Sequence, residues 1–121
     1  MIESFGIGID IVDVSSFEKI SFHSKPGFYK KIFLPSEIKY CLKYKNPYER
    51  FAGKFAIKEA VKKSISVNIP PKKILVSHSN LKPKIELLDK YARKYKFIAS
   101  ISHDKKLAIG VVISEKISKK H

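Results

Sequence analysis

Cysteine is nearly absent from this sequence, since Cys41 is the only one among 121 residues. One thiol cannot form an internal disulfide, so a disulfide-stapled fold is excluded and a reducing compartment, the cytoplasm, is expected. Cys41 lies among helix-forming residues, where a buried small hydrophobe is a commoner role than a nucleophile. No apolar run approaches the roughly 20 residues that cross a bilayer, so we expect no membrane insertion.

Arginine is scarce as well, with only Arg50 and Arg93, whereas lysine is abundant and the formal net charge is +14. Such a charge accelerates encounter with acidic partners, which include nucleic acid, anionic membrane, acidic proteins and phosphorylated metabolites. A lysine-rich proteome would produce part of the same excess. Because so few arginines are left, these two are the informative ones.

Length and patterning predict one α+β domain over residues 1–121. An apolar fraction of 44% and this length suit a single buried core. Helical and strand-like segments do not alternate regularly, which favours a long central helix packed on a small, mostly antiparallel sheet. The basic residues 116–121 are expected to fray. The expected helices are residues 14–22, 28–33, 35–45, 49–66 and 88–94, and the expected strands are residues 2–12, 74–77, 83–87, 97–102 and 106–114.

The helix predicted around residues 50–63 carries the clearest chemical signals. At about 100° per residue, four cations fall in one column, namely Arg50, Lys54, Lys58 and Lys62. Like charges at this spacing repel, so the column suggests an anionic ligand. Glu59 projects among apolar side chains, where a carboxylate is costly unless it is paired or binds a metal. An ion pair with Lys62 or Lys63 is the ordinary alternative.

The first predicted strand has two unlike faces. Its odd residues are apolar and are expected to form a core face: Phe5, Ile7, Ile9 and Ile11. Its even residues are Gly6, Gly8 and Asp10, and glycine in a strand often marks the close approach of a ligand or of another backbone. Asp10 therefore has open space beside it, although it also suits a strand end that caps the next segment.

Three short motifs stand in a characteristic order: Gly6-Ile7-Gly8-Ile9-Asp10, Lys58-Glu59-Ala60 and Ser100-Ile101-Ser102-His103. Together they resemble the holo-acyl-carrier-protein synthase family, the small bacterial 4'-phosphopantetheinyl transferases. The resemblance continues through residues 32–37, 51–56 and 108–114, and so covers nearly the whole chain.

The resemblance implies an enzyme that moves 4'-phosphopantetheine from coenzyme A to a serine of apo acyl carrier protein, releasing 3',5'-ADP with the help of Mg²⁺. It implies an acidic carrier protein as partner, with neither nucleic acid nor membrane involved. Asp10 and Glu59 match its metal ligands, and Lys63 matches a lysine that approaches the phosphates. Glu59, a metal-bound water and Lys63 are all candidates for the base that activates the serine, with Glu59 or water preferred. The expected contacts to coenzyme A are Arg50, Lys54, Lys63, Pro83, Ser102 and His103.

Residue types agree with this chemistry, because phosphoryl transfer needs positioning and charge neutralisation more than covalent help. The sequence nevertheless departs from the family pattern at three positions. Ser16 stands where a first-helix arginine often faces the carrier, Lys54 replaces an arginine, and Leu81 replaces the glycine of a hairpin turn. We therefore expect carrier docking to use dispersed lysines, namely Lys19, Lys25, Lys30 and Lys31.

The resemblance also implies a homotrimer with sites between subunits. A domain of this length offers little concave surface for a ligand as large as coenzyme A, which agrees with a shared cleft. A nucleic-acid-binding module is the main alternative, because Tyr40, Tyr44 and Tyr48 interleave with lysines. Those tyrosines share one i, i+4 face, however, which is more typical of packing. That alternative, and a non-catalytic scaffold for acidic proteins, leave Asp10 and Glu59 unexplained.

Overall fold

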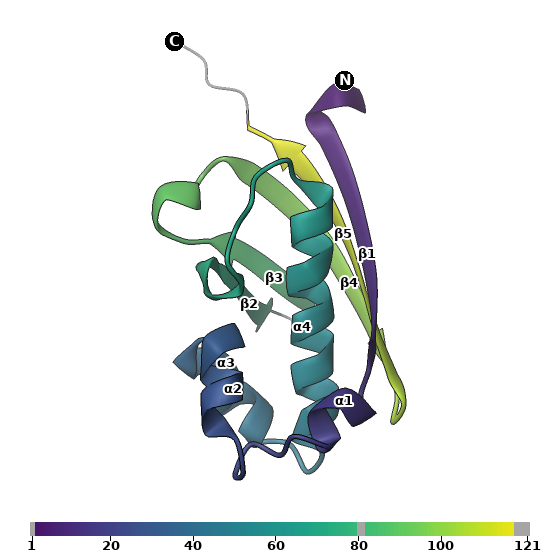
Figure 1. Cartoon of the computed structure of the whole chain (residues 1–121). Helices are drawn as coiled ribbons and strands as arrows, with labels where there is room; N and C mark the ends of the chain where they lie inside the picture. Colours follow the sequence, from purple (N-terminus) through teal and green to yellow (C-terminus); the bar gives the residue numbers. More distant parts are fainter. Residues whose placement is uncertain (1, 80–81, 118–121) are drawn as a thin grey trace.

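The computed structural model describes residues 2–79 and 82–117. The long helix α4 (Pro47–Ser64) lies against a sheet whose strand order is β1 (Phe5–Asp13), β5 (Leu107–Lys116), β4 (Tyr95–His103) (Figure 1). All pairs in this sheet are antiparallel. A separate sheet pairs β2 (Ile74–Ser79) with β3 (Lys82–Leu87), also antiparallel. This architecture confirms the α+β class and the central helix on an antiparallel sheet.

Three short helices surround the N-terminal half of α4, namely α1 (Ser15–Glu18), α2 (Pro26–Ile32) and α3 (Pro35–Leu42) (Figure 1). Asn46 begins α4: its side chain accepts a hydrogen bond from the Tyr48 amide at 3.2 Å, and Pro47 takes the first helical position. In the part of the chain that the structure describes, no helix is long and apolar enough to cross a membrane.

The prediction of a helix over residues 88–94 is wrong. Only a single 3₁₀ turn forms there, η3 (Asp89–Tyr91). Asp89 and Arg93 have φ angles of 57° and 65°, and two left-handed residues this close together interrupt a right-handed helix. The two other 3₁₀ turns among the described residues are η1 (Ile2–Ser4) and η2 (Pro71–Lys73).

The core lies on both sides of α4. Near α1–α3 it is aromatic, and the rings of Tyr29 and Phe33 contact each other and both Phe17 and Phe51. The remaining half is aliphatic and joins α4 to β2 and β5. Cys41 is fully buried, and burial raises the pKa of its thiol to about 12, which confirms its expected place in the core.

The prediction that the odd residues of β1 face the core is wrong for the single chain. Phe5, Ile7, Ile9 and Ile11 lie on the outer face of the sheet, and Ile7 is 69% exposed. The glycine face is the one that packs on α4, because the helix backbone comes too close for any side chain. A Cβ built on Gly8 would lie 1.9 Å from the carbonyl oxygen of Ala60. The close approach expected beside these glycines is therefore that of another backbone.

Gly8→Ala is expected to lower the free energy of unfolding by more than about 2 kcal/mol, because neither backbone can move aside without breaking its hydrogen bonds. Gly27→Ala is the matched control, since a Cβ at Gly27 meets no atom within 4 Å. Gly27 lies in α2, so its replacement should raise stability by up to about 1 kcal/mol. Urea denaturation of both variants checks the pair, and equal midpoints would contradict the close packing described here.

Candidate functional site

Asp10 and Glu59 line one groove of about 450 Å³, which we call the carboxylate groove. Asp10 comes from β1 and Glu59 from α4, which crosses the inner face of that strand. Aromatic rings of α1, α2 and α4 form part of the remaining wall. The full lining is Asp10, Ile11, Val12, Asp13, Ser16, Phe17, Phe28, Ile32, Phe55 and Glu59. Asp10 and Glu59, which are far apart in sequence, thus share one partly apolar recess, and Asp13 is a third carboxylate in its lining.

Lysines balance Asp10 and Glu59. Lys63 donates hydrogen bonds to Asp10 Oδ1 at 2.9 Å and to the Ile9 carbonyl at 3.1 Å. Lys62 Nζ lies 3.5 Å from Glu59 Oε2, so the ordinary ion pair considered for Glu59 is present. The Asp10 side chain is only 18% exposed, whereas that of Lys63 is 55% exposed. A metal ion entering the groove would therefore compete with mobile lysines that solvent can reach.

The donor set of this groove fits a magnesium ion. Mg²⁺ prefers carboxylate and phosphate oxygens and usually keeps several waters, so two protein ligands suffice. Across residues 2–79 and 82–117, no cluster of three or more histidine, cysteine, aspartate or glutamate side chains is placed to hold a metal. A cation here would rely on Asp10 and Glu59 together with oxygens of substrate and water.

A second recess of about 490 Å³, the basic cavity, lies on the other side of α4. Arg50, Gly53 and Lys54 of α4 form one wall, while α3, β2, β3 and β4 supply the others. Its full lining is Tyr40, Tyr44, Arg50, Gly53, Lys54, His78, Pro83, Ile101 and His103. The sequence-predicted residues Arg50, Lys54, Pro83 and His103 are therefore brought together.

Cations and aromatic rings are interleaved in the basic cavity. The Arg50 guanidinium lies 3.9 Å from the centre of the Tyr44 ring, and the Lys54 ammonium lies 4.4 Å from the centre of the Tyr40 ring. Glu49 Oε1 lies 3.1 Å from His103 Nδ1 and orients that imidazole. A planar base and its phosphates suit such a lining, because the rings offer stacking faces and the cations offer charge.

Lys54 is the most buried cation of this cavity, with 2% of its surface exposed. Burial lowers the pKa of its ammonium, which donates a hydrogen bond to the Val76 carbonyl at 2.6 Å. His78 stacks on Tyr40 with ring centres 4.9 Å apart and planes at 7°. Burial, then the charges of Lys54, Arg50 and His103, lower the pKa of His78 to about 4, so it is neutral at physiological pH. An anion in the cavity would offset this excess of positive charge.

Several predicted residues lie elsewhere. Ser102 is exposed on the outer face of β4, and Lys63 accompanies Asp10 at the groove. The basic cavity and the carboxylate groove share no lining residue, so the structure does not unite all the predicted site residues within one chain. Leu81, the departure in the hairpin turn, lies outside the described residues.

The lysine column of α4 does not form a single anion-facing row. Lys58 is fully buried and pairs with Glu37 instead of facing a ligand. Sequence reasoning missed Glu37, and it also missed Tyr40, Tyr44 and His78 as cavity residues. The lysine-interleaved tyrosines did signal Tyr40 and Tyr44, but they were interpreted as a nucleic-acid alternative or as packing. Tyr48, the third of them, accepts a hydrogen bond from the Phe22 amide at 3.1 Å.

Comparison with known proteins defines the class of this fold and site. The model of the 4'-phosphopantetheinyl transferase superfamily matches residues 6–112, and the chain belongs to that superfamily. The holo-[acyl-carrier-protein] synthase of Syntrophus aciditrophicus is 38% identical over 122 residues, covering 91% of this chain and 94% of the relative.

Solved structures agree with this assignment. The Helicobacter pylori holo-[acyl-carrier-protein] synthase in complex with coenzyme A superposes with a TM-score of 0.76 at 37% identity, covering 90% of this chain and 99% of that one. The Bacillus anthracis enzyme in complex with CoA (3',5'-ADP) gives a TM-score of 0.78 at 28% identity, covering 93% and 96%. The family expected from the three sequence motifs is confirmed.

Proposed function

We propose that this chain is a holo-[acyl-carrier-protein] synthase, which transfers 4'-phosphopantetheine from coenzyme A to a serine of apo acyl carrier protein. The observation that carries the proposal is the pair of recesses, one basic and aromatic, the other lined by Asp10 and Glu59, in a chain similar to synthases solved with coenzyme A. The serine oxygen forms a bond to the phosphorus that bears pantetheine. The bond from that phosphorus to the bridging oxygen breaks, and 3',5'-ADP leaves with the electron pair.

In this proposal the basic cavity binds the nucleotide end of coenzyme A. The exposed ring of Tyr44 flanks the base, and Arg50, Lys54 and His103 offset phosphate charge. Tyr40 already carries His78 and Lys54 against its ring and so fixes that wall. Pro83, at the start of β3, closes the wall beside His78. Ser102 lies on the outer face of the sheet, where it can contact coenzyme A only across a subunit boundary.

Asp10 and Glu59 would hold Mg²⁺ in the carboxylate groove. When bound, the ion supplies neutralisation of the pyrophosphate charge. Lys63, held beside Asp10, orients the same phosphates. The proton of the carrier serine needs an acceptor, and Glu59 is the better candidate among this chain's side chains. Lys63 already donates hydrogen bonds to the Ile9 carbonyl and to Asp10, so it is engaged as a donor.

A homotrimer would bring the two recesses together. The outer face of the β1–β5–β4 sheet exposes a continuous apolar surface, and such surfaces commonly mark contacts between proteins. In register, Ile7 lies beside Ile113 and Ile98 lies on the other side of Ile113, so apolar residues span all three strands. If this face packs on a neighbouring copy, the groove of one subunit can meet the basic cavity of the next. Trimerisation and action in the cytoplasm remain predictions.

The most direct test of the proposed reaction is mass spectrometry of an apo acyl carrier protein incubated with this protein, coenzyme A and Mg²⁺. The expected result is a mass increase equal to one phosphopantetheine, together with release of 3',5'-ADP. A carrier that stays unmodified while a known synthase modifies it in parallel would refute the proposal.

Carrier recognition is expected to depend strongly on salt. Lys19, Lys25, Lys30 and Lys31 are exposed around α1 and α2, the helices whose aromatic residues line the carboxylate groove. Ser16, also in that lining, provides no bidentate clamp. The KM for carrier should therefore rise about tenfold between low and physiological salt, with turnover at saturating carrier changing much less. Replacing any one of these lysines should weaken docking only a few-fold, roughly. Steady-state kinetics against salt checks this, and one lysine whose loss abolishes docking would contradict it.

A further inference from the structure

One wall of the basic cavity belongs to a two-stranded sheet that has no backbone hydrogen-bond ladder to another described strand. Strands β2 and β3 pair only with each other, and no ladder joins them to the β1–β5–β4 sheet in the described chain. Yet this small sheet carries His78 and Pro83, which form the cavity wall opposite Arg50 and Lys54 of α4. Something other than strand pairing must therefore fix the distance between the two walls.

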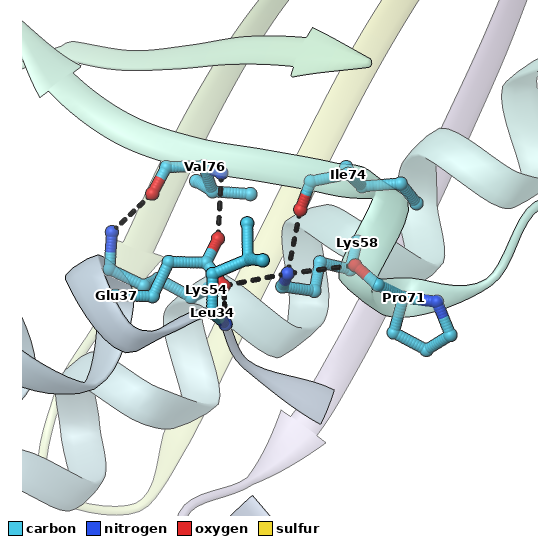
Figure 2. Close-up of polar contacts among 7 residues, drawn as sticks. All are labelled: Leu34, Glu37, Lys54, Lys58, Pro71, Ile74 and Val76. Atoms are coloured by element: carbon cyan, nitrogen blue, oxygen red, sulfur yellow. Dashed lines mark hydrogen bonds and ion pairs between the residues drawn. The ribbon is translucent and has the colours of Figure 1, made fainter. Parts of the chain in front are cut away.

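Side chains perform that task along the open edge of β2. Figure 2 shows Glu37 of α3 and two lysines of α4 converging on this edge. Glu37 Oε2 accepts the Val76 amide at 2.8 Å, Lys54 donates to the Val76 carbonyl at 2.6 Å, and Lys58 donates to the Ile74 carbonyl at 2.6 Å. These side chains occupy the place of a third strand, because they satisfy backbone groups that an edge strand leaves unpaired.

The centre of this arrangement is the ion pair between Glu37 and Lys58. Lys58 Nζ lies 2.8 Å from Glu37 Oε1, and the side chains are 0% and 1% exposed. The three protons of the ammonium are all used, by Glu37, by Ile74 and by the Pro71 carbonyl at 2.9 Å. Glu37 also accepts the Leu34 amide at 2.8 Å and so fixes the start of α3. One buried pair therefore ties α3, α4, η2 and β2 together.

The free energy of unfolding alone does not explain why a buried ion pair is present here. Well-packed apolar residues often stabilise a core as well as a buried ion pair does. What the pair adds is directional hydrogen bonding to specific backbone atoms. We infer that Glu37 and Lys58 are a positioning pair, which holds the wall of His78 and Pro83 at the separation from Arg50 and Lys54 that the nucleotide of coenzyme A requires. The inference rests on the proposed function of the basic cavity.

The Glu37–Lys58 pair influences the binding of coenzyme A in the basic cavity and leaves the carboxylate groove unaffected. Lys58 and Glu59 are neighbours on α4 and project about 100° apart, so Lys58 faces β2 while Glu59 lines the carboxylate groove. Loss of the pair should therefore raise the Kd and KM for coenzyme A without a matching loss of turnover at saturation.

The test compares Lys58→Met with the double variant Glu37→Gln/Lys58→Met. The single variant leaves a buried carboxylate unpaired, so its melting temperature should fall by about 10 °C or more. The double variant removes that charge and should recover at least about half of this loss. Neither variant can tie α4 to Pro71 and Ile74, so both should raise the Kd and KM for coenzyme A about tenfold, with kcat within about threefold. The exposed Lys72→Met, on η2, is the matched control and should change none of these values.

Calorimetry with coenzyme A alone and steady-state kinetics supply the readouts. A double variant that recovers both melting temperature and coenzyme A affinity would overturn the inference, since the pair would then be only a stability element. A fall in kcat with unchanged coenzyme A affinity would also overturn it. If the wild type binds coenzyme A but transfers nothing, the proposed reaction fails while the binding comparison still decides the role of the pair.

Discussion

Replacing either Asp10 or Glu59 with alanine is expected to lower turnover at least about a hundredfold, because charge stabilisation of the transferring phosphoryl group is among the largest contributions to such catalysis. Both carboxylates line the same groove from different elements. Neither is part of the buried core, and Lys63 and Lys62, their present partners, remain hydrated when the carboxylates are lost. Both variants should therefore fold with little change in melting temperature.

Glu86→Ala, an exposed carboxylate on β3, is the matched control and should keep turnover within about twofold of wild type. Magnesium titration separates the roles further, since weakened metal binding should appear as a higher Mg²⁺ requirement in both variants. Near-wild-type turnover in either Asp10→Ala or Glu59→Ala would remove that residue from the site.

Ile9→Glu is expected to abolish assembly and with it more than about 99% of turnover, because a charge placed on an apolar interface cannot be desolvated cheaply. Ile9 is 59% exposed at the middle of β1 and lies opposite Val111 of β5 in the sheet register. The chain itself should still fold, since the side chain points away from α4. Circular dichroism should therefore match the wild type while sedimentation equilibrium reports a monomer.

Leu42→Glu is the control, because Leu42 is also an exposed apolar residue, 40% accessible, but lies on α3 away from the sheet. It should leave both the oligomeric state and the turnover unchanged. An Ile9→Glu monomer with full activity would show that one chain holds a complete site.

Sequence patterns predicted where helices and strands form better than they predicted what each of them packs against. The 3.6-residue period of α4 and the alternation of β1 were strong local signals, and both elements form with small shifts at their ends. The orientation of β1 was wrong because alternation identifies two faces but not what covers each one. An apolar strand face that contacts another subunit has the same alternation as one that contacts the core, so the sequence pattern alone does not distinguish them.

The sequence predicted some residues of the candidate site and missed the contacts of others. Asp10, Glu59 and His103 belong to motifs whose order and spacing resemble those of the family, so the resemblance implies their roles. Glu37 and Lys58 are 21 positions apart on different helices, and no local period links them. Glu37 does stand two residues after Pro35 at a helix start, which signals a capping role, but its ion pair depends on how α3 packs against α4.

We propose that the carboxylate groove of one copy and the basic cavity of its neighbour form a single transferase site. Two inactive variants test it when mixed: Asp10→Ala, which disables the groove, and Arg50→Ala/His103→Ala, which disables the cavity. Transfer to apo carrier protein is measured by mass spectrometry after the two chains are refolded together and native mass spectrometry has verified mixed oligomers. We expect the mixture to regain up to about a quarter of wild-type activity, since that fraction of contacts pairs an intact groove with an intact cavity. Mixed oligomers that stay as inactive as each variant alone would contradict the shared site.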